Sequence, residues 1–464
     1  METTGREAAI GAAWEEFDGG AFLAELAELV AVPTESQNPD RLPELASYLE
    51  NEMRPRLEAL GYACAVLPNP AGAGPLLYAE RIEDAALATV LTYGHGDVIR
   101  GQKARWRDGL NPWTLSVEGD RVYGRGTADN KGQFLVNLRA LANVLAARGH
   151  LGFNSKILIE TGEEVGSPGL AELFQQEKKR LKADVLIASD GPRLQPDRPT
   201  LFLGSRGSLK FSLDLTLRDG AHHSGNWGGL LANPGLVLAH ALATIADRRG
   251  QIRIPEWRPT SLTAEVRTAL EDCKLADLPD QPAIDIDWGE KGLSPQERVF
   301  GWNAFEILAY RTGDPDNPVN AIPGRANAHC QLRFVVGTDV DDVLPALRRH
   351  LDRHGFGAIA VHPSPEPVMH ATRLDVDNPW VRLAATSLER STGKPPAILP
   401  NLGGSLPNDV FSEILGLPTV WVPHSYAGCC QHAPDEHALA SILREALGLM
   451  TGLFWDVGEA GRPA

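Results

Sequence analysis

The stretch ATVLTYGHGD, residues 88–97, joins a strand-like run to polar groups that can bind a metal ion. Its first six residues are mostly apolar, as in a strand buried inside a sheet. Apolar runs at residues 156–160 and 183–188 repeat this pattern, and residues 132–148, which precede both runs, space apolar side chains at helical intervals. Alternating buried strands and helices are typical of an α/β domain with a mostly parallel central sheet.

The pattern changes after residue 207. Residues 209–217 alternate apolar and polar side chains, and residues 326–336 do so again, as expected of an α+β layer whose sheet has one covered face. A helix at residues 380–390 and an apolar strand at 418–422 then return to the first pattern. We therefore predict a discontinuous domain, residues 1–207 and 371–464, with a second domain, residues 208–370, inserted in it.

Composition narrows the classes of function. At 464 residues the chain is too long for one ordinary core, so two domains are expected. The net charge of −16 disfavours nucleic acid and anionic membranes as partners. No apolar run approaches the roughly 20 residues of a membrane span. The acidic first 20 residues do not resemble a signal peptide, and five sparse cysteines without CxxC spacing fit a reduced compartment, so we expect a cytoplasmic protein.

Candidate metal ligands follow the ends of the three predicted buried strands. His95 and Asp97 follow the first strand. The pair Glu163-Glu164 follows the second, and Asp190 follows the third. The carboxyl ends of parallel strands meet at one edge of a sheet, so these groups should converge there. Two further candidates are Asp129, just before the helix at 132–148, and the distant His432.

This set of ligands favours zinc or a similar divalent ion, such as manganese or cobalt. Carboxylates mixed with imidazoles suit such ions. Five protein ligands are too many for one tetrahedral catalytic zinc, but they can serve two ions if one carboxylate bridges. Two zinc ions against three carboxylates and a hydroxide are close to neutral. Such a pair, typically about 3.5–4 Å apart, activates water and polarises a carbonyl.

Each candidate also has an ordinary structural explanation. His95 could be a histidine at a strand end whose ring nitrogens only form hydrogen bonds, and Glu163 and Glu164 could be acidic residues on the surface. Asp129 could be only a helix N-cap, stabilising by about 1 kcal/mol. Asp190 could be a turn residue before a Gly-Pro pair. Their order and common placement favour the metal site.

Eight segments together carry a family resemblance. The sequence resembles the zinc metallopeptidase family of carnosinase-type dipeptidases, aminoacylases, glutamate carboxypeptidase and the acetylornithine and succinyl-diaminopimelate deacylases. The resemblance covers nearly the whole chain, and the markers occur in the family's order. They are LVAVP (29–33), GHGD (94–97), WRDGLNPW (106–113), YGRGTADNKG (123–132), EEVGS (163–167), SD (189–190), HSG (223–225) and HAPDE (432–436).

The resemblance implies a role for each ligand. It assigns His95 and Asp190 to one metal ion, Glu164 and His432 to the other, and Asp129 to a bridge between them. In the same comparison Asp97 fixes the tautomer of the His95 imidazole, as groups behind a metal ligand often do. Glu163 is the implied general base, which takes a proton from water and delivers it to the leaving amine. Spacing alone does not decide between the two adjacent glutamates.

The inserted segment resembles the family's lid and dimerisation domain, which implies a homodimer. His223 matches a histidine that reaches the partner's active site in dimeric relatives and stabilises the oxyanion. Asn320 and Arg333 resemble lid positions that hold substrate, and an arginine fork suits a carboxylate. Gly404 and Ser405 match a glycine-serine loop that can also cup a carboxylate. Without the family resemblance, the alternative is that His223 is a polar loop residue with no role and that Arg333 is an outward-facing residue of a strand.

The expected activity is hydrolysis of a peptide or amide bond in a small substrate with a free carboxylate, as in a dipeptidase or aminopeptidase. Asp190, in place of a glutamate, favours the dipeptidase and aminopeptidase branch. An N-acyl-amino-acid deacylase is the alternative on the same machinery. A silent metal-binding regulatory protein is the alternative from another class, and it usually lacks a ligand or the base. A phosphohydrolase is disfavoured, because no cluster of Arg and Lys for phosphoryl groups stands out.

Overall fold

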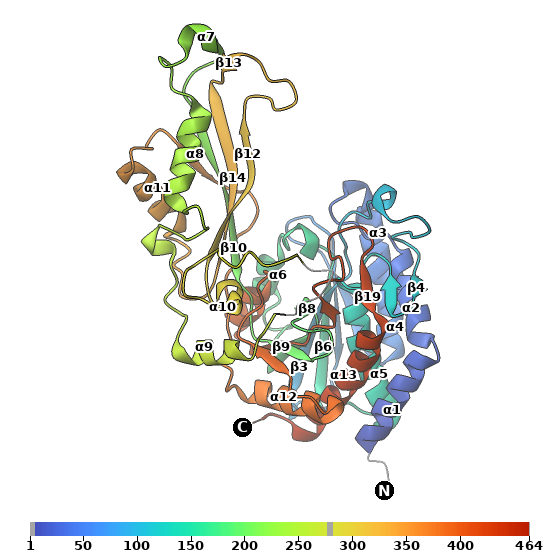
Figure 1. The fold of residues 1–464 in the computed structure, drawn as a ribbon. Helices are drawn as coiled ribbons and strands as arrows, with labels where there is room; N and C mark the ends of the chain where they lie inside the picture. The colour runs from blue at the N-terminus through green and yellow to red at the C-terminus, as the bar shows by residue number, and fades with distance from the viewer. Residues whose placement is uncertain (1–4, 276–281, 464) are drawn as a thin grey trace.

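The computed structural model describes residues 5–275 and 282–463, and the two largest sheets of this part of the chain lie in separate parts of the molecule. One part contains the large central sheet and both ends of the described chain; we call it the body. The other is built around a smaller sheet that extends away from the body, and we call it the projecting part (Figure 1). Its strands come from residues 207–363.

The central sheet has eight strands and is mostly parallel in its middle, which confirms the predicted α/β class. β3 is parallel to β6 and β7, and β7 is parallel to β17. The edge strand β1 and its neighbour β2 are antiparallel to the strands beside them. In order across the sheet the strands are β1 (Ala63–Leu67), β2 (Leu76–Arg81), β6 (Asn154–Glu160), β3 (Thr89–His95), β7 (Val185–Ala188), β17 (Thr419–Trp421), β9 (Thr200–Phe202) and β16 (Ala397–Leu399).

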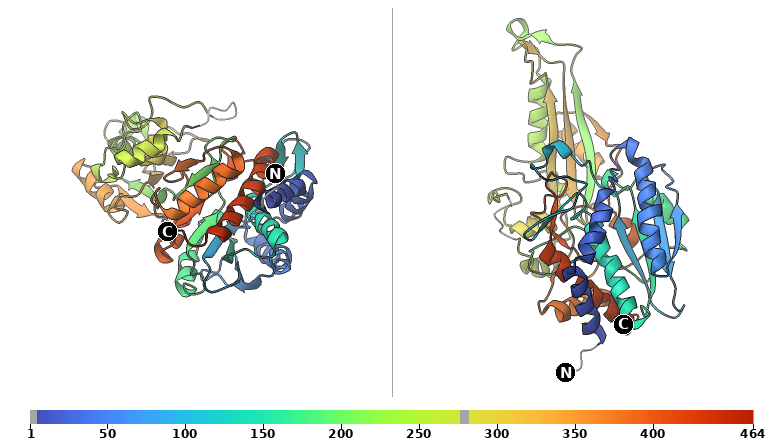
Figure 2. Two further views of the ribbon diagram at one scale, coloured as in Figure 1. Left: turned by 90° about the horizontal axis from the view of Figure 1, so that it is seen from below. Right: turned by 90° about the vertical axis from the view of Figure 1, so that its right-hand side faces the viewer.

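Helices cover both faces of this sheet, because its strands are apolar on both faces. Val90, Ile157 and Val420 belong to the apolar cluster of one face, and Leu91, Leu158 and Trp421 to that of the other. The long helices α1, α5, α12 and α13 of the first face lie side by side, with α13 in contact with the other three (Figure 2). The helices of the first face are α1 (Gly5–Asp18), α2 (Ala21–Ala31), α5 (Lys131–Arg148), α12 (Pro379–Thr392) and α13 (Ala440–Ala460), while α6 (Leu170–Gln176) and η6 (Val410–Ile414) cover the second. None of the helices in the described residues has the length and apolar character of a membrane span.

Short elements complete the body. A three-stranded sheet joins a segment near the chain's end to the first half of the body, since β19 pairs with β5. These elements are η1 (Pro39–Arg41), α3 (Leu42–Ser47), η2 (Tyr48–Met53), α4 (Arg54–Ala59), η3 (Lys103–Arg105), β4 (Ser116–Glu118), β5 (Arg121–Tyr123), η4 (Glu163–Val165), β8 (Pro192–Arg193), β18 (Ser425–Tyr426) and β19 (His437–Leu439).

The projecting part is a two-layer α+β structure. Its antiparallel sheet has the order β12 (Ala304–Thr312), β14 (Arg325–Phe334), β10 (Gly207–Thr216) and β15 (Ala360–Pro363). Buried and half-buried residues alternate along most of β10, as the sequence predicts. Helices α8 (Pro234–Ile245) and α11 (Val343–Arg353), with η5 (Pro255–Trp257), share an apolar cluster with this sheet. A two-stranded pair, β11 (His222–His223) and β13 (Ala321–Ile322), and helix α7 (Ser224–Trp227) lie at its tip (Figure 1).

Two helices that lie between β10 and β12 in sequence pack on the body instead. They are α9 (Ala264–Glu271) and α10 (Pro295–Phe300). Leu270 and Phe300 belong to the same apolar cluster as Leu399 of β16. An ion pair of 2.5 Å between Arg198 and Asp272 adds to this contact. The segment between the two long strands of the projecting part therefore returns to the body before β12 begins.

Candidate active site

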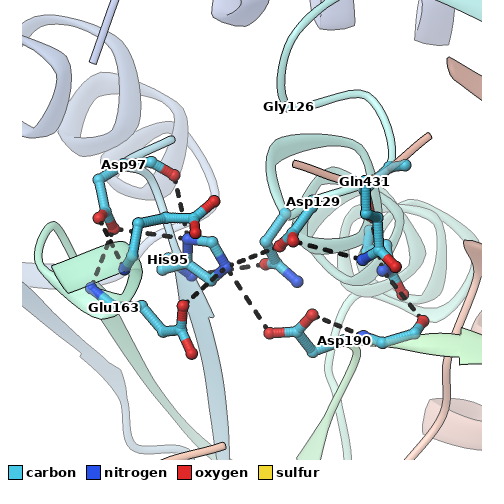
Figure 3. A network of polar contacts seen from close by, with 12 residues as sticks. His95, Asp97, Gly126, Asp129, Glu163, Asp190 and Gln431 are labelled. Carbon is cyan, nitrogen blue, oxygen red and sulfur yellow. Dashed lines mark hydrogen bonds and ion pairs between the residues drawn. The ribbon is translucent and has the colours of Figure 1, made fainter. Parts of the chain in front are cut away.

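Neighbouring parallel strands bring the candidate ligands to one edge of the central sheet. His95 is the last residue of β3 and pairs in register with Glu160, the last residue of β6. The short helix η4 follows β6 and carries Glu163 and Glu164. Asp190 lies two residues beyond the end of β7. Figure 3 shows the side chains of His95, Glu163 and Asp190 pointing toward one another from these separate segments.

The first group of ligand atoms is buried. The Nε2 atom of His95 lies 3.0 Å from Oδ1 of Asp129 and 3.7 Å from Oδ2 of Asp190. All three residues are at most 8% exposed. Asp129 is not the helix N-cap, since Asn130 holds that position before α5. His95, Asp129 and Asp190 thus offer three ligand atoms within 4.8 Å of one another.

The second group shares Asp129 with the first. Nε2 of His432 lies 3.1 Å from Oδ2 of Asp129 and 2.9 Å from Oε2 of Glu164. His432 has a positive φ of 57° and a side chain 58% exposed, so this group opens to solvent on one side. Among the residues that the structure describes, Glu164 belongs to this group and Glu163 to neither.

The cluster carries more negative charge than its own side chains neutralise. Burial and the charge of Asp129 raise the pKa of Glu164 to about 7 and that of Asp190 to about 6. Hydrogen bonds to Asp129 and Glu164 raise the pKa of His432 to about 11. Oδ2 of Asp190 is buried and has no hydrogen-bond partner in the described part of the chain. Buried carboxylates that repel one another, one of them with an oxygen that lacks a hydrogen bond near the His95 imidazole, fit a site for divalent cations.

Asp97 connects the first strand to the glutamate pair. Its backbone oxygen lies 3.0 Å from Nδ1 of His95, and its Oδ1 atom lies 3.4 Å from the same nitrogen. Its carboxylate also accepts the backbone N–H groups of Glu163, at 3.3 Å, and Glu164, at 3.1 Å. Asp97 is fully buried. It therefore holds the His95 ring and the η4 backbone together.

Glu163 faces the ligand groups without joining them. Its Oε2 atom lies 4.0 Å from Nε2 of His95, and its side chain is 13% exposed. Burial, with the charges of Glu164 and Asp190, raises the pKa of Glu163 well above its ordinary value. A carboxyl group whose affinity for protons is raised and which borders a cavity suits general acid–base chemistry.

A buried ion pair supports Asp129, and no role for it was predicted from the sequence. Oε1 of Glu436 accepts the backbone N–H groups of Gly126, Ala128 and Asp129 at 3.0–3.1 Å. Its Oε2 atom pairs with Nη1 of Arg125 at 2.5 Å, and both side chains are 1% exposed. The only signal in the sequence is that Glu436 ends the HAPDE marker. The pair joins the loop that carries Asp129 to the segment that carries His432.

Asn130 and Gly132 fix the same loop from the other side. The side-chain amide of Asn130 donates to the backbone oxygen of Ser189 at 2.8 Å, and its oxygen accepts the backbone N–H of His95 at 3.4 Å. A Cβ atom at Gly132 would lie 2.1 Å from the backbone oxygen of Thr127, so the tight turn into α5 requires glycine. Both residues lie inside the YGRGTADNKG marker, but the sequence does not show which groups they contact.

Two cavities adjoin the ligand groups. One, of about 1090 Å³, is lined by Asp129, Asp190 and the Gly404–Ser405 segment, and the other has a volume of about 520 Å³. Glu163, Arg333, Ser405 and His432 line both. Nη1 of Arg333 donates to Oγ of Ser405 at 3.0 Å. The structure thus brings Arg333, Gly404 and Ser405 next to the predicted metal ligands.

His223 and Asn320 lie elsewhere. The backbone oxygen of Asn320 accepts the N–H of Ser224 at 2.9 Å, next to the pairing of β11 with β13. These elements lie at the tip of the projecting part, remote from the body (Figure 1). Neither residue is among the described residues that line the two cavities. Within one chain, the predicted oxyanion histidine and its neighbour therefore stay apart from the ligand groups.

Comparison with known proteins identifies the family. The model of peptidase family M20/M25/M40 matches residues 91–456. The chain belongs to this family. This M20 chain is therefore a metallopeptidase, as the sequence resemblance predicted, and its matched region includes every candidate ligand from His95 to His432.

Relatives of this M20 peptidase cover most of its length. A Beta-Ala-His dipeptidase of Mus musculus is 32% identical over 443 residues, which is 89% of this chain and 88% of the relative. A Cysteinylglycine-S-conjugate dipeptidase of Corynebacterium striatum is 25% identical over 83% of this chain and 84% of its own length. The crystal structure of the M20 family metallo-carboxypeptidase Sso-CP2 from Sulfolobus solfataricus has a TM-score of 0.79 at 26% identity and covers 94% of this chain and 99% of its own.

Proposed function

We propose that this M20 peptidase is a dipeptidase that hydrolyses the amide bond of a small substrate with a free carboxylate. The observation that carries the proposal is the pair of ligand groups sharing Asp129, with Glu163 beside them at the junction of two cavities. The two relatives described above are both named dipeptidases, and they cover most of the chain. The proposed catalytic domain comprises residues 1–207 and 371–464.

The proposed cofactor is a pair of zinc ions, for which manganese or cobalt could substitute. His95 and Asp190 would hold one ion, Glu164 and His432 the other, and Asp129 would bridge them, which agrees with the two groups of ligand atoms. When bound, the ions would supply Lewis-acid polarisation of the scissile carbonyl and make water more acidic.

Glu163 is the proposed general base and acid. Its carboxylate lies beside the ligand groups and borders both cavities, where it can accept a proton from the attacking water and then release that proton to the leaving amine. Asp97 is a positioning residue in this scheme, because its carboxylate holds the backbone of η4 on which Glu163 lies.

Arg333, Gly404 and Ser405 are the proposed holders of the substrate carboxylate. The Arg333 guanidinium and the Ser405 hydroxyl are in contact at 3.0 Å and can face one carboxylate together. Holding that end fixes the amide carbonyl relative to the ligand groups.

We further propose that residues 208–370 form a lid and that two chains associate through it. The outer strand β12 exposes Ile307, Leu308 and Tyr310, each at least 40% exposed. An exposed apolar edge strand is a surface that proteins usually cover. In such a dimer His223 and Asn320, at the tip of the projecting part, would reach the active site of the partner, where His223 would stabilise the oxyanion.

Replacement of Glu163 by Gln tests the function. The zinc-loaded wild type should hydrolyse dipeptides, whereas Glu163→Gln should bind zinc normally and lose about 100- to 10,000-fold in kcat. Glu172→Gln, an exposed change on α6, is the matched control and should keep full activity. Panels of dipeptides and N-acyl amino acids separate the dipeptidase from a deacylase. If neither panel is turned over, the proposal fails.

A further inference from the structure

One wall of the larger cavity is apolar. We call the space beside it the apolar chamber and define it by Leu194, Val299, Phe300, Leu399, Leu402 and Leu406. The cavity also borders Asp129, Asp190 and His432, so a group in the chamber can belong to a molecule that reaches the ligand groups. The whole cavity has a volume of about 1090 Å³, slightly above the roughly 300–1,000 Å³ of small-molecule sites, and far exceeds what a diglycine needs.

From this arrangement we propose that the enzyme selects dipeptides whose C-terminal residue has a large apolar side chain, such as Leu or Phe. The inference rests on the proposed dipeptidase function and specifies its substrate class. Burying such a side chain removes apolar surface from water and would favour these substrates over ones with a C-terminal glycine.

The chamber is preformed, because its walls are part of the core. Leu399, Leu402, Leu406 and Phe300 are each at most 8% exposed and belong to the apolar cluster on one face of the central sheet. Leu194 and Val299 are half-buried and pack against the same cluster. A wall that is already ordered costs little to organise when a substrate binds.

The chamber provides few hydrogen-bond partners for a polar side chain of a substrate. The guanidinium of Arg193, which also lines the cavity, is 1% exposed and donates to Glu445 at 2.5 Å and to the backbone oxygens of Pro196 and Pro423. The hydrogen bonds of its Nε and Nη1 atoms are therefore directed to the protein, while its Nη2 atom is buried from solvent and has no hydrogen-bond partner in the described part of the chain. A polar substrate side chain placed beside these leucines would lose water without gaining an equivalent partner.

The position of the carboxylate loop assigns the chamber to the C-terminal residue. Leu402 and Leu406 flank the Gly403–Ser405 segment in sequence, and a Cβ atom at Gly403 would lie 2.8 Å from Cγ1 of Val299. The chamber wall therefore packs directly against the loop proposed to hold the carboxylate. The Cα atom that bears this carboxylate also bears the C-terminal side chain, which consequently lies next to the chamber.

The smaller cavity has a different character, which separates the two halves of the substrate. Its lining includes Lys210, Gln331 and Glu366, and Lys210 forms an ion pair with Glu366. Since both cavities meet at Glu163, a dipeptide whose amide lies there extends into each of them. We place the amino-terminal residue, which is polar at its amine, on the side of the smaller cavity.

The test compares kcat/KM of the zinc-loaded wild type for Gly-Gly, Gly-Leu and Gly-Phe with that for Leu-Gly and Phe-Gly. We expect Gly-Leu and Gly-Phe to exceed Gly-Gly by at least about 10-fold, since even one methylene in an apolar pocket is worth about 10- to 200-fold. Equal values along the Gly-X series, or a gain only along the X-Gly series, would overturn the assignment while leaving the dipeptidase function intact. If the wild type hydrolyses none of these dipeptides, both the assignment of the chamber and the proposed dipeptidase function are contradicted.

Variants of the chamber wall supply the second measurement. Val299→Ser and Leu194→Ser change half-buried side chains, and the readout is the ratio of kcat/KM for Gly-Phe to that for Gly-Gly. This ratio does not depend on the fraction of folded enzyme, and it should fall by about 10-fold. Val117→Ser, an exposed change on β4, is the control. An unchanged ratio in both wall variants contradicts the proposal.

Discussion

Replacement of Glu436 by Gln should weaken metal binding, although this residue is not a proposed ligand. The glutamine keeps the size of the side chain and one acceptor oxygen. It removes the charge that faces the Arg125 guanidinium at 2.5 Å, at a place where both side chains are 1% exposed. The carboxylate also accepts three backbone N–H groups, including that of Asp129. One substitution therefore disturbs a buried ion pair and the loop that orients the shared ligand.

The expected size of the effect follows from these contacts. Leaving one partner of a buried ion pair unpaired typically costs about 3–5 kcal/mol of stability. Loss of a group that orients a metal ligand typically lowers metal affinity about 10- to 100-fold. We expect both effects in Glu436→Gln, with much of the activity recovered at saturating zinc, because Asp129 itself is still present.

The assay is a zinc titration in competition with a chromophoric chelator, alongside urea unfolding of the same samples. The matched control is Asp456→Asn, which breaks another buried pair, since Asp456 lies 2.9 Å from Arg6 and both side chains are below 10% exposed. The control should lose stability and keep its zinc affinity. If Glu436→Gln also keeps its zinc affinity, then Glu436 supports only the fold, and the reasoning about Asp129 is wrong.

Three other predictions concern stability. Gly132→Ala should lower the free energy of unfolding by about 1–3 kcal/mol through overpacking, because the new Cβ would lie 2.1 Å from the backbone oxygen of Thr127. Gly11→Ala in α1 places its Cβ in open space and should raise the free energy of unfolding by about 0.8–1 kcal/mol. Urea unfolding measures both changes. Burial and the charge of His354 lower the pKa of His350 below 6.5, so the unfolded chain binds a proton that the folded chain does not. The free energy of unfolding should therefore fall as the pH drops through 6.5. His350→Gln should make this dependence on pH weaker, and an unchanged dependence would contradict the role of His350. Chelation of the metal should lower Tm, and free zinc at about 100 times Kd should restore about 2.7 kcal/mol per site, measured by thermal unfolding with added zinc.

Much of the fold could be predicted because its signals are local. The apolar runs that end at Tyr93, Glu160 and Ala188 correspond to β3, β6 and β7, and the helix predicted from residue 132 begins at 131. Alternation along β10 marked the change to a sheet with one covered face. The ends of elements differ by one or two residues, since they depend on hydrogen bonds that periodicity does not specify.

What could not be predicted depends on contacts between distant segments. Glu436 and Arg125 are 311 positions apart, so their pairing leaves no trace in spacing. The return of α9 and α10 to the body was also not foreseen, because the segment from 252 to 318 has no clear periodicity. His95, Glu164 and Asp190 could be predicted as ligands because each follows the end of a strand, and parallel strands place such ends together. The roles of Asp129 and His432 came from the family resemblance. Sequence alone did not show that His223 and Asn320 lie at the tip of the projecting part.

The attachment of α10 to the body has a consequence for the timing of catalysis. Phe300 packs with the body, while Ala304, four residues later, already begins a strand of the projecting sheet. A rotation of that sheet would therefore leave the floor beneath the substrate's side chain where it is. If the projecting part closes as proposed, the side chain would be recognised before closure, so that poor substrates would dissociate from the open enzyme and only well-seated ones would remain long enough to be enclosed.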